Sequence, residues 1–349
     1  MKILTAADQF SVFEDGSVLS IGNYDGIHCG HGQIIKHLCQ MGASHGVPSA
    51  LFTLDPHPVS LLYPEREPPK LCTVEEKASY LADLGVDYLI AYPIDQSFLE
   101  LTAIEFFKEF VVNKLHVKAM VEGPNFYFGK NREGDIKSLH EYCKKDHIQL
   151  RIEQPAQAGG EIISSTRIRT LLSSGEIDLA NELLGRWYSI TGVVKSGAGR
   201  GRMLGFPTAN LEQIPTLIPA AGVYSGLVSF DKKREGGVSL SRQNLEKKEL
   251  FQEVSFQASL FQDGKMRRPK ADKIYLPAAI HIGKNPTFAE ERLKVEVHVL
   301  DFQGDLYEEE LTLYFLQKVR EVTEFSGEES LVAQLEKDVQ STRDLVEAL

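Results

Sequence analysis

The first half of the chain alternates short apolar runs with segments of helical periodicity, and this alternation limits the fold more than any other feature. Apolar runs of four to six residues predict strands. A helical pattern at 73–84 begins with a capping box of Thr73 and Glu76 and is followed by Gly85, signals that delimit a helix. Strands that alternate with helices favour an α/β fold with a doubly wound parallel sheet. The predicted strands are 18–21, 49–54, 87–92, 119–122 and 150–153.

After Arg186 the pattern changes to β-rich segments punctuated by glycine and proline, which predicts an antiparallel β-barrel. We therefore place a domain boundary near Leu184, which gives domains 1–184 and 185–349. A charged stretch at about 231–272 indicates a solvated insertion in the second domain, with a basic recognition tail as the alternative. The predicted strands are 188–194, 222–230, 274–282 and 293–302, and the other predicted helices are 103–115, 165–173, 177–184 and 331–349.

The composition excludes several classes of protein. At 349 residues, with 42% hydrophobic and 25% charged residues, the chain matches an ordinary soluble protein of two domains. A net charge of −11 argues against a nucleic-acid partner, because polyanions attract basic surfaces. No apolar run reaches about 18 residues and no signal peptide is evident, so we expect a cytoplasmic protein without a membrane partner. The four cysteines form no CxxC pair, so neither a zinc site nor a disulfide framework is expected.

A glycine-rich run from Gly22 to His31 joins the first predicted strand to a helical stretch. His28 and His31 stand three residues apart where that helix begins. A helix N-terminus offers unpaired N–H groups and a partial positive charge, and histidines can donate hydrogen bonds to phosphate oxygens. Ligands of doubly wound sheets bind at the C-terminal ends of strands where the crossover direction reverses. The run therefore predicts a phosphate site, with two surface histidines at an ordinary turn as the alternative.

Three further segments of the first half carry side chains that suit a nucleotide. His57 lies in a proline-stiffened turn after a strand, and Asn125 lies in a glycine-flanked aromatic loop. That loop either contacts a planar ring or packs in the core. Ser165 and Thr166 are N-cap types at the start of a helix, and Arg169 lies one turn further. A capped helix end with an arginine predicts a triphosphate clamp.

These four elements, in this order, resemble the FMN adenylyltransferase module of bacterial bifunctional riboflavin kinase/FAD synthetases, a Rossmann-like nucleotidyltransferase. The matching stretches are 22–31, 55–58, 122–129 with 132–135, and 164–169. The resemblance implies that AMP passes from ATP to FMN, giving FAD and pyrophosphate, with His28, His31 and Arg169 at the ATP phosphates. The binding residues that it implies are Gly22, Asn23, Asp25, Gly26, His57, Asn125, Ser165 and Thr166.

The second half contains the run GRGRMLGFPTANL, from Gly199 to Leu211. Glycine-rich backbone can wrap phosphates, although a plain glycine-rich hairpin would look similar. Thr208 and Asn210 alternate along a predicted strand, so they present two oxygen ligands on one face. Such ligands suit Mg²⁺, which keeps water and substrate phosphates as its other ligands. The run resembles the riboflavin kinase signature.

Downstream segments match the riboflavin kinase family in order, at 221–224, 282–288 and 295–302. In that family the glutamate of the last strand is the proposed general base, and Glu296 takes that place. The resemblance implies that Glu296 accepts the proton of the riboflavin 5′-hydroxyl during its attack on the γ-phosphate of ATP. Without the resemblance, a solvated strand carboxylate is the alternative. The other binding residues implied are Gly199, Arg200, Gly205, Phe206, Pro207 and Arg320.

The chain departs from the family pattern at Cys29, Tyr127 and His281, where Leu, Arg or Thr, and Asn are more usual. The departures at Cys29 and Tyr127 motivate one alternative, a riboflavin kinase whose N-terminal module is weak or inactive. A non-catalytic flavin- or RNA-binding protein is a further alternative. The expected partners are riboflavin, FMN and ATP, with FMN and FAD as substrate and product rather than prosthetic groups. A weak homo-oligomer is left open.

Overall fold

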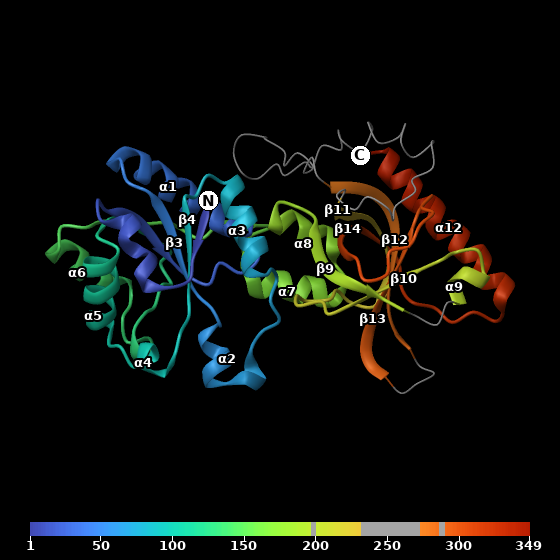
Figure 1. The fold of residues 1–349 in the computed structure, drawn as a ribbon, viewed down its shortest axis with the longest axis horizontal. Coiled ribbons are helices and arrows are strands. Elements are labelled where there is room, and N and C mark those ends of the chain that lie inside the picture. Colours follow the sequence, from blue (N-terminus) through green and yellow to red (C-terminus); the bar gives the residue numbers. More distant parts are fainter. Residues whose placement is uncertain (197–199, 232–272, 286–289) are drawn as a thin grey trace. The chain divides into compact units, whose positions relative to one another are not determined.

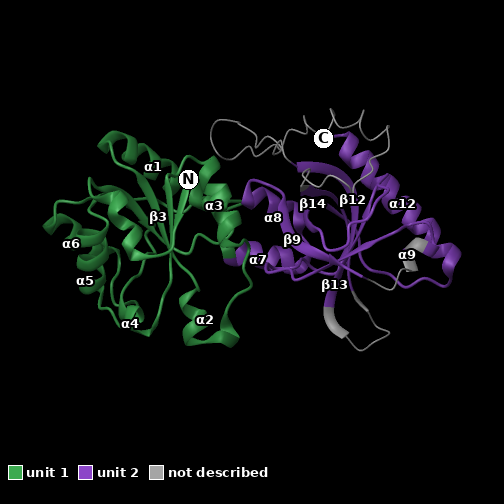
Figure 2. Cartoon of the chain, in the orientation of Figure 1, with its two compact units in different colours: residues 1–165 green, residues 166–349 purple. Residues whose placement is uncertain are grey.

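The computed structural model describes residues 1–196, 200–231, 273–285 and 290–349 (Figure 1). The chain divides into two compact units, 1–165 and 166–349 (Figure 2). The first is built on a six-stranded sheet and the second on a closed barrel, as the two sequence patterns predict. The predicted boundary near Leu184 stays a prediction. The charged stretch at 232–272 lies outside the described residues.

The sheet of the first unit has the strand order β1-β4-β3-β2-β5-β6, and all its neighbouring strands run parallel. From β2 the chain adds β3 and β4 on one side, and β5 and β6 lie on the other. The crossover direction therefore reverses between β2 and β5, which confirms the predicted doubly wound sheet. The strands are β1 (Lys2–Leu4), β2 (Ser17–Ile21), β3 (Ser49–Leu54), β4 (Tyr88–Tyr92), β5 (Val117–Glu122) and β6 (Gln149–Ile152).

Helices cover both faces of this sheet. Neighbouring residues of a strand point to opposite faces, and apolar side chains on each face pack against helices. Val18 and Leu51 belong to one buried cluster, which includes residues of α1 and α3. Leu19 and Phe52 belong to the other, which includes residues of η1, α5, η3 and α6. The helices and the small hairpin of this unit are η1 (Ala7–Phe13), α1 (Cys29–His45), α2 (Pro58–Leu62), η2 (Pro64–Arg66), α3 (Val74–Asp83), α4 (Gln96–Leu99), α5 (Ala103–Phe106), η3 (Phe107–Lys114), η4 (Lys130–Arg132), α6 (Ile136–Lys145), β7 (Gln157–Ala158) and β8 (Glu161–Ile162).

Two helices test the local signals of the sequence. At α3 the predicted capping box is present, since the Thr73 hydroxyl accepts the N–H of Glu76 and the Glu76 carboxylate accepts the N–H of Thr73. The helix predicted at 103–115 is regular only through Phe106 and is π-helical from Phe107 to Lys114. Phe106, Phe107 and Phe110 all lie in one buried cluster, so the wider π-helical turn is compatible with packing of these three rings in the core.

The second unit is a closed antiparallel barrel with the strand order β10-β13-β12-β11-β14-β9, closed by pairing of β9 with β10. Strand β14 is absent from the sequence-based prediction. The strand predicted at 293–302 ends earlier, at Val299, because Asp301 adopts a left-handed φ of 55°. The strands are β9 (Tyr188–Lys195), β10 (Ala209–Glu212), β11 (Gly222–Asp231), β12 (Lys273–Asn285), β13 (Glu290–Val299) and β14 (Glu310–Arg320).

Helices pack on the outside of the barrel. The Asn181 side chain of α8 donates to the Phe315 carbonyl at 2.9 Å and accepts the Tyr188 N–H at 2.6 Å, which ties α8 to two strands. Val346 of α12 packs in a cluster with Leu227 and Leu316 of the barrel strands. Among the described residues, no helix is long and apolar enough to cross a membrane. The helices of this unit are α7 (Ser165–Ser174), α8 (Ile177–Leu184), α9 (Arg200–Met203) and α12 (Glu328–Glu347).

Candidate active sites

The two histidines of the glycine-rich run lie where β2 leads into α1, beside the reversal of the crossover. His28 is the N-cap residue of the 17-residue helix α1. Its ring stacks on that of His31, with centroids 3.7 Å apart and planes at 18°. The Tyr24 ring contacts His31 with centroids 4.8 Å apart. The predicted phosphate site is therefore a stacked pair of imidazoles at a helix N-terminus, where N–H groups and the helix dipole favour anions.

Polar side chains fill the divergence between β2 and β5 beneath this turn. The Ser20 hydroxyl donates to the Val121 carbonyl at 2.5 Å and is hydrogen-bonded to the Tyr24 hydroxyl. The buried Glu122 carboxylate accepts the N–H of Ile21 at 2.8 Å. Burial raises the pKa of Glu122 well above its usual value. Burial, and then the charge of Glu122, raise the pKa of Tyr24.

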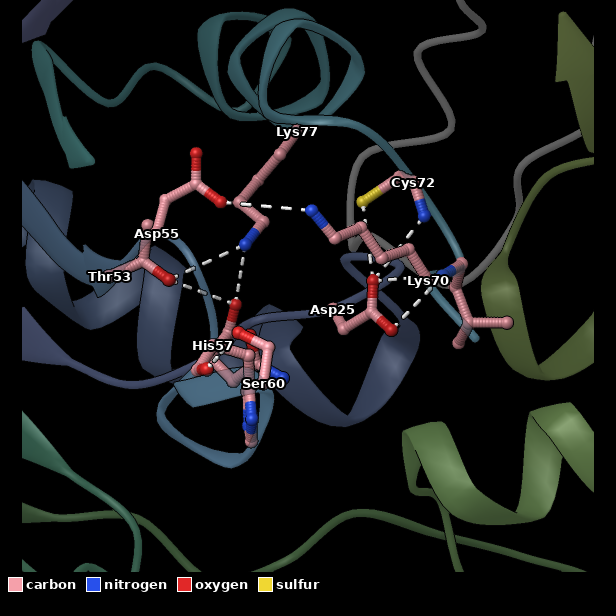
Figure 3. Close-up of polar contacts among 10 residues, drawn as sticks. Asp25, Thr53, Asp55, His57, Ser60, Lys70, Cys72 and Lys77 are labelled. Carbon is pink, nitrogen blue, oxygen red and sulfur yellow. Dashed lines mark hydrogen bonds and ion pairs between the residues drawn. The ribbon is translucent and has the colours of Figure 1, made fainter. Parts of the chain in front are cut away.

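Asp25 ties the same turn to a distant part of the chain (Figure 3). Its buried carboxylate accepts the N–H groups of Leu71 at 3.0 Å and Cys72 at 3.3 Å. The Cys72 Sγ atom accepts the N–H of Gly26 at 3.2 Å, and the Ser165 hydroxyl donates to the Asp25 carbonyl at 2.9 Å. These contacts of Asp25 anchor the loop, and its predicted contact with a nucleotide stays a prediction.

His57 is held in one orientation at the N-terminus of α2. Its Nδ1 atom accepts the N–H of Val59 at 3.1 Å, and its carbonyl accepts the Ser60 hydroxyl at 2.6 Å. Since Nδ1 is an acceptor here, the neutral ring carries its proton on Nε2. In this tautomer Nε2 is the donor, which suits the predicted role of His57 as a nucleotide-binding residue.

The aromatic loop after β5 divides between the core and the surface. Phe128 is buried and stacks on Phe126, with centroids 5.3 Å apart. Asn125 and Tyr127 are exposed, and the Arg132 guanidinium lies 4.5 Å from the centre of the Tyr127 ring. Core packing therefore explains Phe128, and Asn125 is the polar side chain of this loop that solvent reaches.

The helix predicted from the serine and threonine pair is α7, which begins at Ser165. Thr166 is exposed and Arg169 is partly buried, three residues apart on one side of this helix. Both belong to the second compact unit. Their predicted contacts with the phosphates bound at His28 stay a prediction.

In the second unit the kinase-like segment folds back on itself and lies against β13. The Phe206 N–H donates to the Gly201 carbonyl at 2.9 Å, and Gly205 supplies the required left-handed φ of 86°. His298 Nδ1 donates to the Pro207 carbonyl at 2.8 Å, and its ring meets that of Phe206 edge-on. Gly199 and the side chain of Arg200 lie outside the described residues. His298 is a residue that sequence reasoning missed, since no local signal links it to Pro207.

Strand register brings predicted residues that are far apart in sequence into one row. Asn210 pairs with Glu296, Glu296 with His281, His281 with Val223, and Val223 with Arg320. Directly paired residues point to the same face of a sheet. The neighbours of Glu296 along β13 are fully buried, whereas Glu296 is partly exposed. The row therefore lies on the outer face of the barrel wall.

The row has a charged end at α12. Asp338, which is missing from the sequence-based prediction, accepts hydrogen bonds from Arg320 Nε at 3.0 Å and Nη2 at 2.7 Å. These two bonds direct the guanidinium of Arg320 at α12. Within the row, burial lowers the pKa of His281, and the negative charge of Glu296 opposes that shift.

The donors predicted for a metal are all oxygen atoms. Thr208 is exposed immediately before β10, and Asn210 is partly exposed within it. Among the described residues, no group of three or more His, Cys, Asp or Glu is arranged for a metal ion. A hydroxyl and an amide oxygen near Glu296 fit Mg²⁺, which takes few protein ligands when phosphates complete its shell.

A parallel α/β unit with histidines at its crossover reversal, followed by a six-stranded barrel with a polar row, defines a two-domain nucleotide-dependent transferase. A family model described as FAD synthetase matches residues 11–167, and one described as riboflavin kinase matches 184–346. The bifunctional riboflavin kinase/FMN adenylyltransferase of Escherichia coli strain K12 is 31% identical over 331 residues, which cover 95% of this chain and 93% of that protein. The chain therefore belongs to the family of bifunctional riboflavin kinase/FMN adenylyltransferases.

Two further similarities span nearly the same length. A Listeria monocytogenes protein of the same description is 34% identical over 329 residues, covering 93% of this chain and 91% of that protein. A solved Streptococcus pneumoniae structure, described as a macrolide-efflux protein, superposes with a TM-score of 0.74 and 27% identity, covering 94% of each chain. Both similarities extend over the two units together.

Proposed function

We propose that this chain makes both flavin nucleotides. The second unit transfers the γ-phosphoryl group of ATP to riboflavin, giving FMN and ADP. The first unit transfers AMP from a second ATP to FMN, giving FAD and pyrophosphate. The observation that carries the proposal is the pairing of two sites within one chain of this family: the stacked histidines at the start of α1 and the row of Asn210 and Glu296.

In the first unit the FMN phosphate is already a competent nucleophile, so the reaction requires no general base. Its oxygen attacks the α-phosphorus of ATP, and the bond to the β-phosphate breaks to release pyrophosphate. Catalysis is then mostly positioning and stabilisation of charge. His28 and His31 donate to the phosphates, and Arg169 assists. Support comes from the stacked rings at the N-terminus of α1.

In the second unit Glu296 accepts the proton of the riboflavin 5′-hydroxyl as that oxygen attacks the γ-phosphorus of ATP. ADP leaves with the electrons of the broken bond. Thr208 and Asn210 would hold Mg²⁺, which neutralises phosphate charge when bound. Arg320, held by Asp338, shapes the far end of the row. Support comes from the pairing of Asn210 with Glu296.

A riboflavin kinase with a weak N-terminal module is not favoured, because the FAD synthetase model matches residues 11–167 and holds both histidines. A binding protein without turnover is opposed by Thr208, Asn210 and Glu296 together. The contacts of the other binding residues, a cytoplasmic location, the absence of nucleic-acid and membrane partners and a weak oligomer stay predictions.

The test is a double variant, His28→Ala with His31→Ala, assayed with riboflavin, ATP and Mg²⁺ and separated by chromatography. We expect FMN to form at nearly the wild-type rate while FAD formation is lost. His45→Ala, at the exposed C-terminal end of the same helix, is the matched control and should form both products. Loss of both products from the folded double variant would refute separate sites, and chelation of Mg²⁺ should stop FMN formation.

A further inference from the structure

Lys77 of α3 is a buried cation with no role in the proposed chemistry. Lys77 is only 6% exposed, although a lysine is rarely buried unless its ammonium is paired. Burial lowers the pKa of Lys77, while the charges of Cys72, Asp25 and Asp55 oppose that shift and Lys70 adds to it. Figure 3 shows the ammonium beside Thr53, with Asp55, Lys70, Asp25 and Cys72 around it. The cost of burying this ammonium must therefore be offset by the groups that it bonds.

The ammonium completes the hydrogen bonding where the sheet ends. The last backbone bond from the end of β2 to β3 runs from the Gly22 N–H to the Phe52 carbonyl at 2.9 Å. One residue further on, the Asn23 carbonyl accepts Lys77 Nζ at 2.6 Å and the Thr53 hydroxyl at 3.3 Å. Nζ also lies 3.5 Å from the Thr53 hydroxyl oxygen. Just beyond the last backbone bond between the two strands, the side chains of Lys77 and Thr53 therefore hold the chain through the Asn23 carbonyl.

The turn that begins at this carbonyl is strained. Tyr24 has a φ of 48° and Ile27 a φ of 35°, left-handed conformations that cost about 1–2 kcal/mol each for a residue with a side chain. Such conformations persist only where the surroundings enforce them. His28 follows directly, and the Tyr24 ring contacts His31. The Asn23 carbonyl, bonded to Lys77, is therefore one fixed point of the turn that carries both imidazoles, besides the contacts that anchor Asp25.

We propose that Lys77 is a positioning residue for adenylyl transfer, whose ammonium fixes the Asn23 carbonyl and thereby the turn that presents His28 and His31. The inference rests on the proposed function of the first unit. Lys77 touches no substrate and acts through the backbone. Its removal should therefore raise the barrier to transfer more than it weakens substrate binding.

The test compares Lys77→Met with Lys77→Arg in the full-length chain, with FMN and MgATP as substrates. For Lys77→Met we expect kcat of FAD formation to fall about 10- to 100-fold, the effect of a small misplacement of catalytic groups. We expect KM for FMN and for ATP to change less than about threefold. Lys77→Arg, which keeps the charge and donors, should recover part of kcat. Lys108→Met, which removes a partly exposed lysine of η3, is the control and should match the wild type.

A role in packing alone predicts the opposite order, because methionine fills the buried channel while arginine overfills it. Full kcat in Lys77→Met, or a higher kcat in Lys77→Met than in Lys77→Arg, overturns the inference. FMN formation by the second unit of the same molecules reports folding of the rest of the chain. If Lys77→Met does not fold, Lys77→Gln decides, since it removes the ammonium and leaves a shorter polar side chain. Wild-type kcat in Lys77→Gln overturns the inference, and a fall of about tenfold or more at nearly constant KM supports it.

The wild-type protein separates the two levels of failure. If it forms no FAD from FMN and ATP, the proposed function of the first unit is wrong. If it forms FAD and the Lys77 variants equal it in kcat, only the role of Lys77 is wrong.

Discussion

The Glu122 carboxylate of β5 accepts the backbone N–H of Ile21 at the end of β2, across 2.8 Å. Paired residues of the two strands end at Leu19 and Met120, before this point. Glu122 thus replaces a ladder bond on the β5 side of β2, and Lys77 and Thr53 hold the Asn23 carbonyl just beyond the end of β2. Side chains therefore hold the chain on both sides of the point where it leads into the histidine turn.

Glu122→Gln should stabilise the protein at neutral and alkaline pH. Burial raises the pKa of Glu122, so the folded state retains a proton that the unfolded state has already lost. Stability therefore falls as pH rises from the unfolded pKa through the folded pKa. Glutamine cannot ionise and still offers an oxygen to Ile21. We expect a gain of about 1 kcal/mol or more at pH 8 that vanishes near pH 4, measured by urea unfolding followed by circular dichroism.

Glu75→Gln, on the exposed side of α3, is the control for loss of one negative charge. It should leave the dependence of unfolding free energy on pH unchanged. A Glu122→Gln variant with the wild-type pH dependence would show that Glu122 is not a source of that dependence.

Local signals in the sequence predicted what local chemistry determines. The capping box of α3 and the strand at Ser49–Leu54 are confirmed because each depends on neighbouring residues. Lys77 also had a signal, since it stands with Val74 and Leu81 at helical spacing on an apolar face. A charged residue on such a face indicates a buried partner, but which carbonyl it meets depends on the packing of α3 against the sheet.

The row on the barrel was predictable only in part. Motifs selected Asn210, Glu296 and Arg320, yet their alignment depends on the register of strands, and a shift of one residue would turn each side chain to the other face. His298 and Asp338 carry no local signal, because their partners lie 91 and 18 residues away. Contacts between distant segments are what sequence pattern leaves undetermined.

Asp338→Asn should destabilise the second unit strongly. The Asp338 side chain is 3% exposed and that of Arg320 19%, and removing one charge leaves a partly buried guanidinium without its partner. The expected cost is about 3 kcal/mol. Trp187 is the only tryptophan of the chain and packs against the cluster of Leu227, Leu316 and Val346, so its fluorescence during urea unfolding follows this unit.

Asp301→Asn is the matched comparison. Asp301 pairs with Arg343 of α12, the helix that also holds Asp338, at an exposed site where the two side chains are 44% and 32% exposed. Its expected cost is below about 1 kcal/mol. Equal losses of unfolding free energy in the two variants would show that the buried pair of Arg320 and Asp338 contributes no more to stability than the exposed pair.

Gly129→Ala should destabilise the first unit more than Gly85→Ala. Both glycines have a positive φ, 74° and 85°, so both variants carry backbone strain of at least about 1–2 kcal/mol. Gly129 also has a ψ of 174°, a combination that is essentially restricted to glycine, so its variant carries more of that strain. A Cβ at Gly129 would lie 2.5 Å from the backbone nitrogen of Ala103, whereas one at Gly85 meets nothing within 4 Å. The clash should add about 1–3 kcal/mol. Unfolding curves that coincide for the two variants would contradict the close approach of Gly129 to α5.

Glu296→Gln tests the chemistry of the second unit. The amide keeps the size of the side chain and its place beside Asn210 but cannot accept the hydroxyl proton of riboflavin. We expect FMN formation to slow about 10²- to 10⁴-fold, the usual contribution of a general base. FAD formation from added FMN should continue, because Glu296 has no role in the proposed adenylyl transfer. Glu212→Gln, at an exposed position of β10, is the control and should keep full FMN formation. Full FMN formation in Glu296→Gln would exclude Glu296 as the base and leave the row of Asn210 and His281 a binding surface alone.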